Sequence, residues 1–256
     1  MYPELFRIND FVISSFGVMV ALAFLVAYWV ASIEFKRKGL DERLLNNLLL
    51  VSMIGGIVGA KLFYVFENVP LGDLLANPFP YLFSRGGLTF YGGFLGAVFL
   101  VLLLSWKNRV SFWTIADALA PSIAIGHAIG RIGCFLVGDD YGTPSNLPWA
   151  MSFPKGLPPT TEKVHPTQIY EALYLGIVFL ILWRLRKRER GGGWLFSVFL
   201  ILSGVERFFI EFIRQTTPSP IPGLSIAQLV ALLLVLFAVV RLCIIYNRNQ
   251  SRASRV

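Results

Sequence analysis

The sequence is poor in charged residues. Charged side chains make up 15% of its 256 residues and apolar ones 55%, whereas an ordinary soluble domain carries about a quarter charged residues. The mean hydropathy of +0.65 is too high for one soluble core of this size, but several membrane spans account for it. The composition therefore excludes an ordinary soluble fold.

Cysteine is scarce, and a cleavable leader is not evident. The two cysteines, Cys134 and Cys243, lie in apolar segments. This pattern does not fit a secreted disulfide framework. It does not fit a zinc site either, because a zinc site needs clustered ligands, so we expect no metal. Residues 1–10 lack the basic start and small-residue cleavage site of a signal peptide. We therefore expect the first span to be retained.

Seven apolar runs are long enough, at roughly 20 residues, to cross the hydrocarbon layer as helices. Lipid cannot satisfy open backbone groups, and no ten-residue alternation of the barrel type recurs. We predict an all-α polytopic integral membrane protein with one transmembrane domain over 1–256. Its predicted spans are 11–33, 44–66, 88–105, 112–137, 167–184, 194–213 and 224–246.

The basic residues are distributed unevenly between the connecting segments. Fourteen of the 23 fall in 34–43, 106–111, 184–190 and the C-terminal tail, and five lie in the segments on the opposite side. Basic loops mark the cytoplasmic side, so the N-terminus is predicted outside and the C-terminus inside. The net charge of +8 then indicates topology and a lipid bilayer partner rather than nucleic acid.

Two segments on the predicted outer side are rich in proline and aromatic residues. They are 67–87 and 138–165. Proline prevents regular helix there, and aromatic side chains favour the headgroup zone. We expect partly ordered interfacial elements, with simple connecting loops as the alternative.

Several charged residues fall inside the predicted spans. A charge at the centre of a helix costs about 2.5–3.5 kcal/mol on insertion, so each is a functional candidate. Pairing between helices is the structural alternative, favoured for Asp117 and Glu206, and residues near span ends can snorkel. The seven candidates are Lys61, Asp117, Arg131, Glu171, Glu206, Arg207 and Glu211.

Arg131 and Arg207 point most directly to a ligand. Glycines surround Arg131 in the sequence, which fits either close helix packing or access for a lipid headgroup to the guanidinium. Arg207 and Glu211 share a helical face as an i,i+4 pair, so an internal salt bridge is the rival interpretation there. Two arginines that reach one anion would form a phosphate clamp able to stabilise a leaving group.

Two further clusters lie at predicted span ends. Tyr91-Gly92-Gly93 at the outer end of the third span fits close packing or a local break, and Tyr91 alone fits an aromatic belt. His165 begins a motif that opens the fifth span, with Pro166 in an N1-like position. His165 alone also fits a surface imidazole.

Together these segments resemble the bacterial phosphatidylglycerol–prolipoprotein diacylglyceryl transferases. The match runs in order from the first span to the last, with a weaker block at Gly55 to Tyr64, where Lys61 replaces the usual arginine. The residues that carry it are Gly130-Arg131-Ile132-Gly133-Cys134-Phe135 with Gly138 and Gly142, Tyr91-Gly92-Gly93, His165-Pro166-Thr167-Gln168-Ile169-Tyr170-Glu171, Arg207 with Glu211-Phe212-Ile213-Arg214-Gln215, and Ser225 to Gln228.

The resemblance implies a multi-pass enzyme of the bacterial inner (cytoplasmic) membrane that needs no cofactor. It would transfer the diacylglyceryl group of phosphatidylglycerol to the lipobox cysteine of a preprolipoprotein, the first step of lipoprotein maturation. A thioether would form and glycerol 1-phosphate would leave. By this analogy Arg131 holds the lipid phosphate and Arg207 assists at the phosphate or leaving group. The other residues it assigns to phosphatidylglycerol binding are Lys61, Gly92, Gly93, His165, Gln168 and Glu211.

The sequence departs from the family pattern at positions that affect the thiol base. Cys134 and Val137 replace asparagines, and Asp139 replaces a glutamate. Tyr91 replaces a histidine, and its phenol, with an ordinary pKa of about 10, is a poor base at neutral pH. We predict Asp139 as the base and Tyr91 as a positioning donor.

Other functions remain compatible with the same residues. A non-catalytic phospholipid-binding or translocating protein is the main alternative, because arginines between small residues also suit a headgroup path. A divergent transferase acting on another thiol or lipid is a third possibility. A small-solute transporter fits less well, since no paired inverted repeat is evident.

Overall fold

A computed structural model of the chain describes residues 3–8, 11–84, 86–188, 190–214 and 223–253. In these ranges, long helices cover most of each predicted apolar run. They are α1 (Ser15–Arg37), α2 (Glu42–Asn68), α5 (Phe90–Lys107), α6 (Phe112–Val137), α7 (Thr167–Leu185), α8 (Trp194–Ile210) and α9 (Ile226–Ala253). All except α8, which has 17 residues, are long and apolar enough to span a membrane. The all-α polytopic class is confirmed, while the span count and the orientation of the termini stay predictions.

Short elements occupy the connecting segments. The antiparallel hairpin of β1 (Glu4–Ile8) and β2 (Phe11–Ser14) precedes α1. Segment 67–87 contains α3 (Leu71–Ala76) and α4 (Phe79–Leu82), and segment 138–165 contains β3 (Met151–Phe153) and β4 (Thr160–Val164), which are antiparallel. Phe153 and Val164 are each 1% exposed, and Tyr141 stacks on Phe153 with ring centroids 5.4 Å apart. This small apolar cluster gives the second segment a core of its own.

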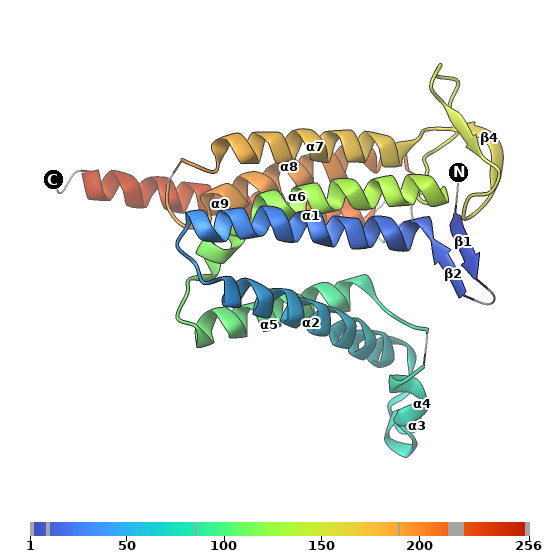
Figure 1. The fold of residues 1–256 in the computed structure, drawn as a ribbon, viewed down its shortest axis with the longest axis horizontal. Helices are drawn as coiled ribbons and strands as arrows, with labels where there is room; N and C mark the ends of the chain where they lie inside the picture. The colour runs from blue at the N-terminus through green and yellow to red at the C-terminus, as the bar shows by residue number, and fades with distance from the viewer. Residues whose placement is uncertain (1–2, 9–10, 85, 189, 215–222, 254–256) are drawn as a thin grey trace. The chain divides into compact units, whose positions relative to one another are not determined.

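The chain divides into two compact units, each described by itself. The first comprises Met1–Glu34 and Ala116–Val256, and the second comprises Phe35–Ile115. In the first unit, α1, α6, α7, α8 and α9 run alongside one another, and both β-hairpins lie at one end of this bundle (Figure 1). The end of α6 and the start of α7 therefore meet near the β3–β4 hairpin.

A buried apolar cluster of the first unit forms where three helices meet. Its buried side chains are Ala120 and Ala124 of α6, Val178 and Leu182 of α7, and Leu195 and Phe199 of α8. Next to this cluster, Asp117 of α6 binds the start of α8. Its carboxylate accepts hydrogen bonds from the backbone N–H groups of Gly193 at 2.7 Å and Phe196 at 2.8 Å. Asp117 thus satisfies backbone donors that the first turn of a helix leaves open.

The second unit is built on close contact between α2 and α5. A Cβ atom on Gly55 would lie 2.6 Å from the backbone oxygen of Gly96, and one on Gly93 would lie 2.9 Å from that of Gly56. Only glycine allows the two backbones to approach this closely. Of the two interpretations of the glycines near Tyr91, the structure therefore supports close packing.

Candidate active site

Two arginines and two carboxylates form a closed set of ion pairs at the hairpin end of the first unit. Arg131 Nη1 lies 2.7 Å from Asp140 Oδ2, and Arg131 Nε lies 2.6 Å from Glu171 Oε2. Arg214 Nη2 lies 2.8 Å from Asp140 Oδ1, and Arg214 Nη1 lies 3.3 Å from Glu171 Oε1. We call these four residues the arginine–carboxylate ring. Each carboxylate bridges both guanidinium groups, so the two cations are held side by side.

Burial distinguishes the two carboxylates of the ring. The side chain of Glu171 is 1% exposed and that of Asp140 is 43% exposed, while those of Arg131 and Arg214 are 11% and 10% exposed. Burial alone would raise the pKa of Asp140, but Arg214, Arg131 and Arg207 outweigh it and lower that pKa. The ring therefore has a closed side at Glu171 and an open side at Asp140.

The start of α7 holds the chain that carries Asp139 and Asp140. Helix α6 ends at Val137, and Gly138 and Asp140 then take φ angles of 79° and 58°. Thr167 Oγ1 donates to the backbone oxygen of Asp140 at 2.7 Å, and Gln168 Nε2 donates to that of Asp139 at 2.5 Å. Thr167 and Gln168 are fully buried, so the loop is fixed at its backbone.

Gly142 is the point where the loop meets the segments that carry His165 and Arg214. Its N–H donates to the backbone oxygen of His165 at 2.9 Å, and Thr143 N–H donates to that of Ile213 at 2.8 Å. A Cβ atom at Gly142 would contact the backbone oxygen of Ile213 and would lie 2.8 Å from Thr167 Cγ2. Only glycine lets these three segments converge.

Cys134 and Asp139 lie beside the ring. Arg131 Nη1 lies 3.8 Å from Cys134 Sγ, and the ligand atoms of Cys134, Asp139 and Asp140 lie within 4.8 Å of one another. Both oxygens of Asp140 already contact arginines, so this group is poorly suited to a metal. Burial raises the pKa of Asp139, and Asp140 adds to that rise, against the opposing effects of Cys134 and Arg131.

The family model described as prolipoprotein diacylglyceryl transferase matches residues 3–244. The chain belongs to this family. Its relatives include three proteins named phosphatidylglycerol–prolipoprotein diacylglyceryl transferase. The one from Clostridium tetani (strain Massachusetts / E88) is 33% identical over 93% of this chain and 96% of its own length. Those from Bordetella avium (strain 197N) and Aliivibrio salmonicida (strain LFI1238) are each 36% identical, over 83% and 96% of this chain and 81% and 88% of their own lengths. The family resemblance is thus confirmed.

Within the transferase fold, Arg207 is adjacent to the ring rather than part of it. Arg207 Nη2 lies 3.1 Å from Glu211 Oε2, and the side chains are 32% and 3% exposed. The internal salt bridge weighed from the i,i+4 spacing is therefore present. Arg207 still acts on the ring through its charge, because it contributes to the lowered pKa of Asp140.

His165 contributes to the site mainly through its backbone. Its ring Nδ1 lies 3.4 Å from Tyr170 Oη, which also accepts a hydrogen bond from Trp149 Nε1 at 2.7 Å. Its backbone pairs with Gly142 and Thr143. His165 and Gln168 therefore lie next to the Asp139–Asp140 loop, and their predicted contacts with lipid stay predictions.

The remaining predicted residues belong to the second unit. Lys61 Nζ donates to the backbone oxygens of Ser84 and Gly86 at 3.0 and 2.6 Å and to Ser84 Oγ at 2.6 Å. Gly92 packs against α2, where a Cβ atom would meet Phe63, and Gly93 packs there too. Tyr91 is 46% exposed. Lys61 thus anchors a loop, and its predicted contact with lipid, like those of the Tyr91 block, stays a prediction.

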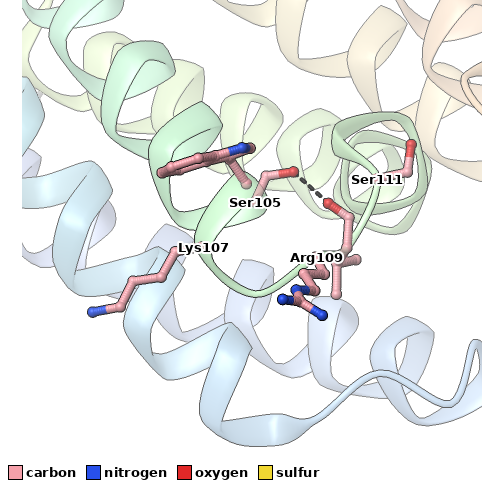
Figure 2. Close-up of a pocket in the computed structure, with 6 residues that line it drawn as sticks. Ser105, Lys107, Arg109 and Ser111 are labelled. Atoms are coloured by element: carbon pink, nitrogen blue, oxygen red, sulfur yellow. Dashed lines mark hydrogen bonds between the residues drawn. The ribbon is translucent and has the colours of Figure 1, made fainter.

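An open pocket of about 780 Å³ also lies within the second unit, at the turn between α5 and α6. Figure 2 shows Lys107 and Arg109 at this turn, with Ser105 donating to the backbone oxygen of Val110 at 2.5 Å. The six residues that line it include none of the predicted site residues.

Asp140 and Arg214 were not predicted as site residues. Glu171 was weighed as a charge within a span and quoted in the motif that begins at His165, but it was given no role in the site. Arg214 stands in the quoted motif, seven residues after Arg207. The signal for Asp140 is weaker, a second aspartate directly after Asp139. Gln215, the last residue of that motif, lies outside the described residues.

Proposed function

We propose that this chain transfers the diacylglyceryl group of phosphatidylglycerol to the lipobox cysteine of a prolipoprotein in the bacterial cytoplasmic membrane. Family membership supports the activity, and the curated relatives that carry this name match most of the chain. The observation that carries the site assignment is the arginine–carboxylate ring, which presents two guanidinium groups on its open side. Paired guanidinium groups suit the oxygens of a phosphodiester.

In the proposed reaction, the cysteine sulfur attacks the carbon of the diacylglyceryl group that bears the phosphate. A carbon–sulfur bond forms, the carbon–oxygen bond breaks, and the oxygen leaves with the electron pair as glycerol 1-phosphate. Arg131 holds the phosphate, and Arg214 joins it because the two share both carboxylates. Arg207, more exposed than either, assists as charge develops on the leaving group. Fixed cations of this kind stabilise that charge without reorganisation.

The thiol must lose its proton, because the thiolate is the nucleophile. We assign this step to Asp139. Burial raises the pKa of its carboxyl, and its Oδ1 is buried with no hydrogen-bond partner among the residues that the structure describes. A carboxylate with a raised pKa and an unused oxygen is a better proton acceptor than an exposed aspartate. Tyr91 remains the predicted positioning donor.

The test is direct transfer in detergent micelles that contain phosphatidylglycerol. Purified protein is incubated with a peptide that carries a lipobox, and the peptide is examined by mass for the thioether adduct. We expect product from the natural chain and a loss of at least 10²-fold with Arg131→Ala, in line with removal of one donor to a developing anion. Lipid binding without product would favour the non-catalytic lipid protein, and normal activity of Arg131→Ala would refute the phosphate site.

A further inference from the structure

We propose that Asp140 occupies the phosphate position between Arg131 and Arg214 in the lipid-free protein, and that the phosphodiester of the incoming lipid displaces it. This inference rests on the proposed function and identifies a specificity-determining residue for it. Each Asp140 oxygen contacts a different guanidinium, Oδ2 on Arg131 at 2.7 Å and Oδ1 on Arg214 at 2.8 Å. The two non-bridging oxygens of a phosphodiester can make the same pair of contacts.

Burial indicates which carboxylate leaves. Glu171 bridges the same arginines, but its side chain is 1% exposed, against 43% for Asp140. Moving Glu171 would leave a charge in a buried place without a partner, which is costly. Asp140 can turn into the solvent-accessible space it already borders. The open side of the ring is therefore the side where exchange takes place.

The backbone around Asp140 is arranged so that only the side chain has to move. Thr167 Oγ1 holds the Asp140 carbonyl at 2.7 Å, and Gln168 holds the preceding carbonyl at 2.5 Å. Rotation about the Asp140 side-chain bonds leaves both contacts intact. The displacement thus needs no refolding of the loop between α6 and β3.

Charge balance requires an exchange rather than an addition. The ring holds two cations and two anions, so it is neutral as it stands. A phosphodiester added to the intact ring would bring an uncompensated negative charge into a region of low dielectric. If it replaces Asp140 on the arginines, the buried group stays neutral. Asp140 thereby competes with every anion that enters, and only a ligand with two suitably spaced oxygens replaces both contacts.

The first test compares Asp140→Asn with Glu162→Gln, which removes the same charge from an exposed position on β4. The dissociation constant is measured for phosphatidylglycerol in dodecyl maltoside micelles and separately for glycerol 1-phosphate. We expect Asp140→Asn to bind phosphatidylglycerol at least threefold more tightly and Glu162→Gln to stay within twofold of the natural chain. Unchanged or weaker lipid binding by Asp140→Asn would overturn the proposal. So would a gain confined to glycerol 1-phosphate.

The second test uses the natural chain and does not depend on how a variant folds. Carbodiimide modification of Asp140 and Glu162 is followed by peptide mass with and without phosphatidylglycerol. Displacement should raise modification of Asp140 at least twofold and leave Glu162 unchanged, and no rise at Asp140 refutes displacement. If the chain passes these tests but yields no thioether, the result contradicts the proposed function alone. If it makes thioether but fails these tests, the result contradicts only the role of Asp140.

Discussion

Glu171→Gln is the change that tests the ring as a structural unit most sharply. Glutamine keeps the shape of the side chain but removes the negative charge that faces both Arg131 and Arg214 at 2.6 and 3.3 Å. Breaking a buried ion pair from one side costs about 3–5 kcal/mol. Asp140 still faces both arginines, so we expect the lower end, about 3 kcal/mol. At about 2–4 °C per kcal/mol for a chain of this size, the Tm should fall by roughly 6–12 °C.

The assay is thermal unfolding of the purified protein in one detergent, followed by tryptophan fluorescence. Glu162→Gln serves as the control, because it makes the same chemical change at an exposed position, and its Tm should stay within about 1 °C, as is usual for surface substitutions. A Tm shift for Glu171→Gln that is no larger than that of the control would refute the reasoning. It would mean that the ring contributes no cooperative stability, and that the arginines reach their positions by other contacts.

Three further outcomes follow from the site. Asp139→Asn should abolish transfer while phosphatidylglycerol still binds. In the natural chain, kcat/KM should decrease as the pH is lowered through the pKa of Asp139. Because burial raises that pKa, the decrease should begin at a higher pH than an ordinary aspartate would give. A flat profile, or full activity in the variant, would remove the base assignment. Arg207→Gln should lower kcat more than it raises KM, because Arg207 is paired with Glu211 rather than placed in the ring. Steady-state kinetics in which only KM changes would contradict this assignment. Gly142→Ala should lower both Tm and activity, since its Cβ would meet the backbone oxygen of Ile213, and a variant with unchanged Tm and transfer would contradict the close approach.

The sequence predicted the helices well because long apolar runs leave few structural alternatives in lipid. The ordered elements inside the connecting segments were harder to predict. Strands β3 and β4 are short, and they depend on tertiary contacts such as the stacking of Tyr141 on Phe153. For Lys61, the sequence is compatible with either snorkelling or ligand binding. Its observed contacts with Ser84 and Gly86 depend on a loop conformation that residue spacing does not specify.

The end of α8 shows why Arg214, the second arginine of the ring, was not predictable from residue spacing. The apolar run predicted a helix over 194–213, which would place Arg214 directly after the last helical residue, one turn beyond the Arg207–Glu211 pair. The helix instead ends at Ile210, and a turn follows in which Arg214 N–H bonds the backbone oxygen of Ile210 at 3.1 Å. The turn separates the two arginines. Arg207 stays paired with Glu211, the residue that directly follows the helix, while Arg214 is carried to Asp140 and Glu171.

The same turn is fixed from outside the helix by the loop that carries Asp140. Thr143 N–H bonds the backbone oxygen of Ile213, so the position of Arg214 depends on a segment some 70 residues earlier in the chain. One loop therefore supplies an acidic partner to Arg131 and Arg214 and also holds the backbone next to Arg214. The same loop thus serves phosphate binding through the Asp140 side chain and the placement of the second arginine through its backbone. A lipid that displaces the Asp140 side chain leaves that backbone contact, and hence Arg214, in place.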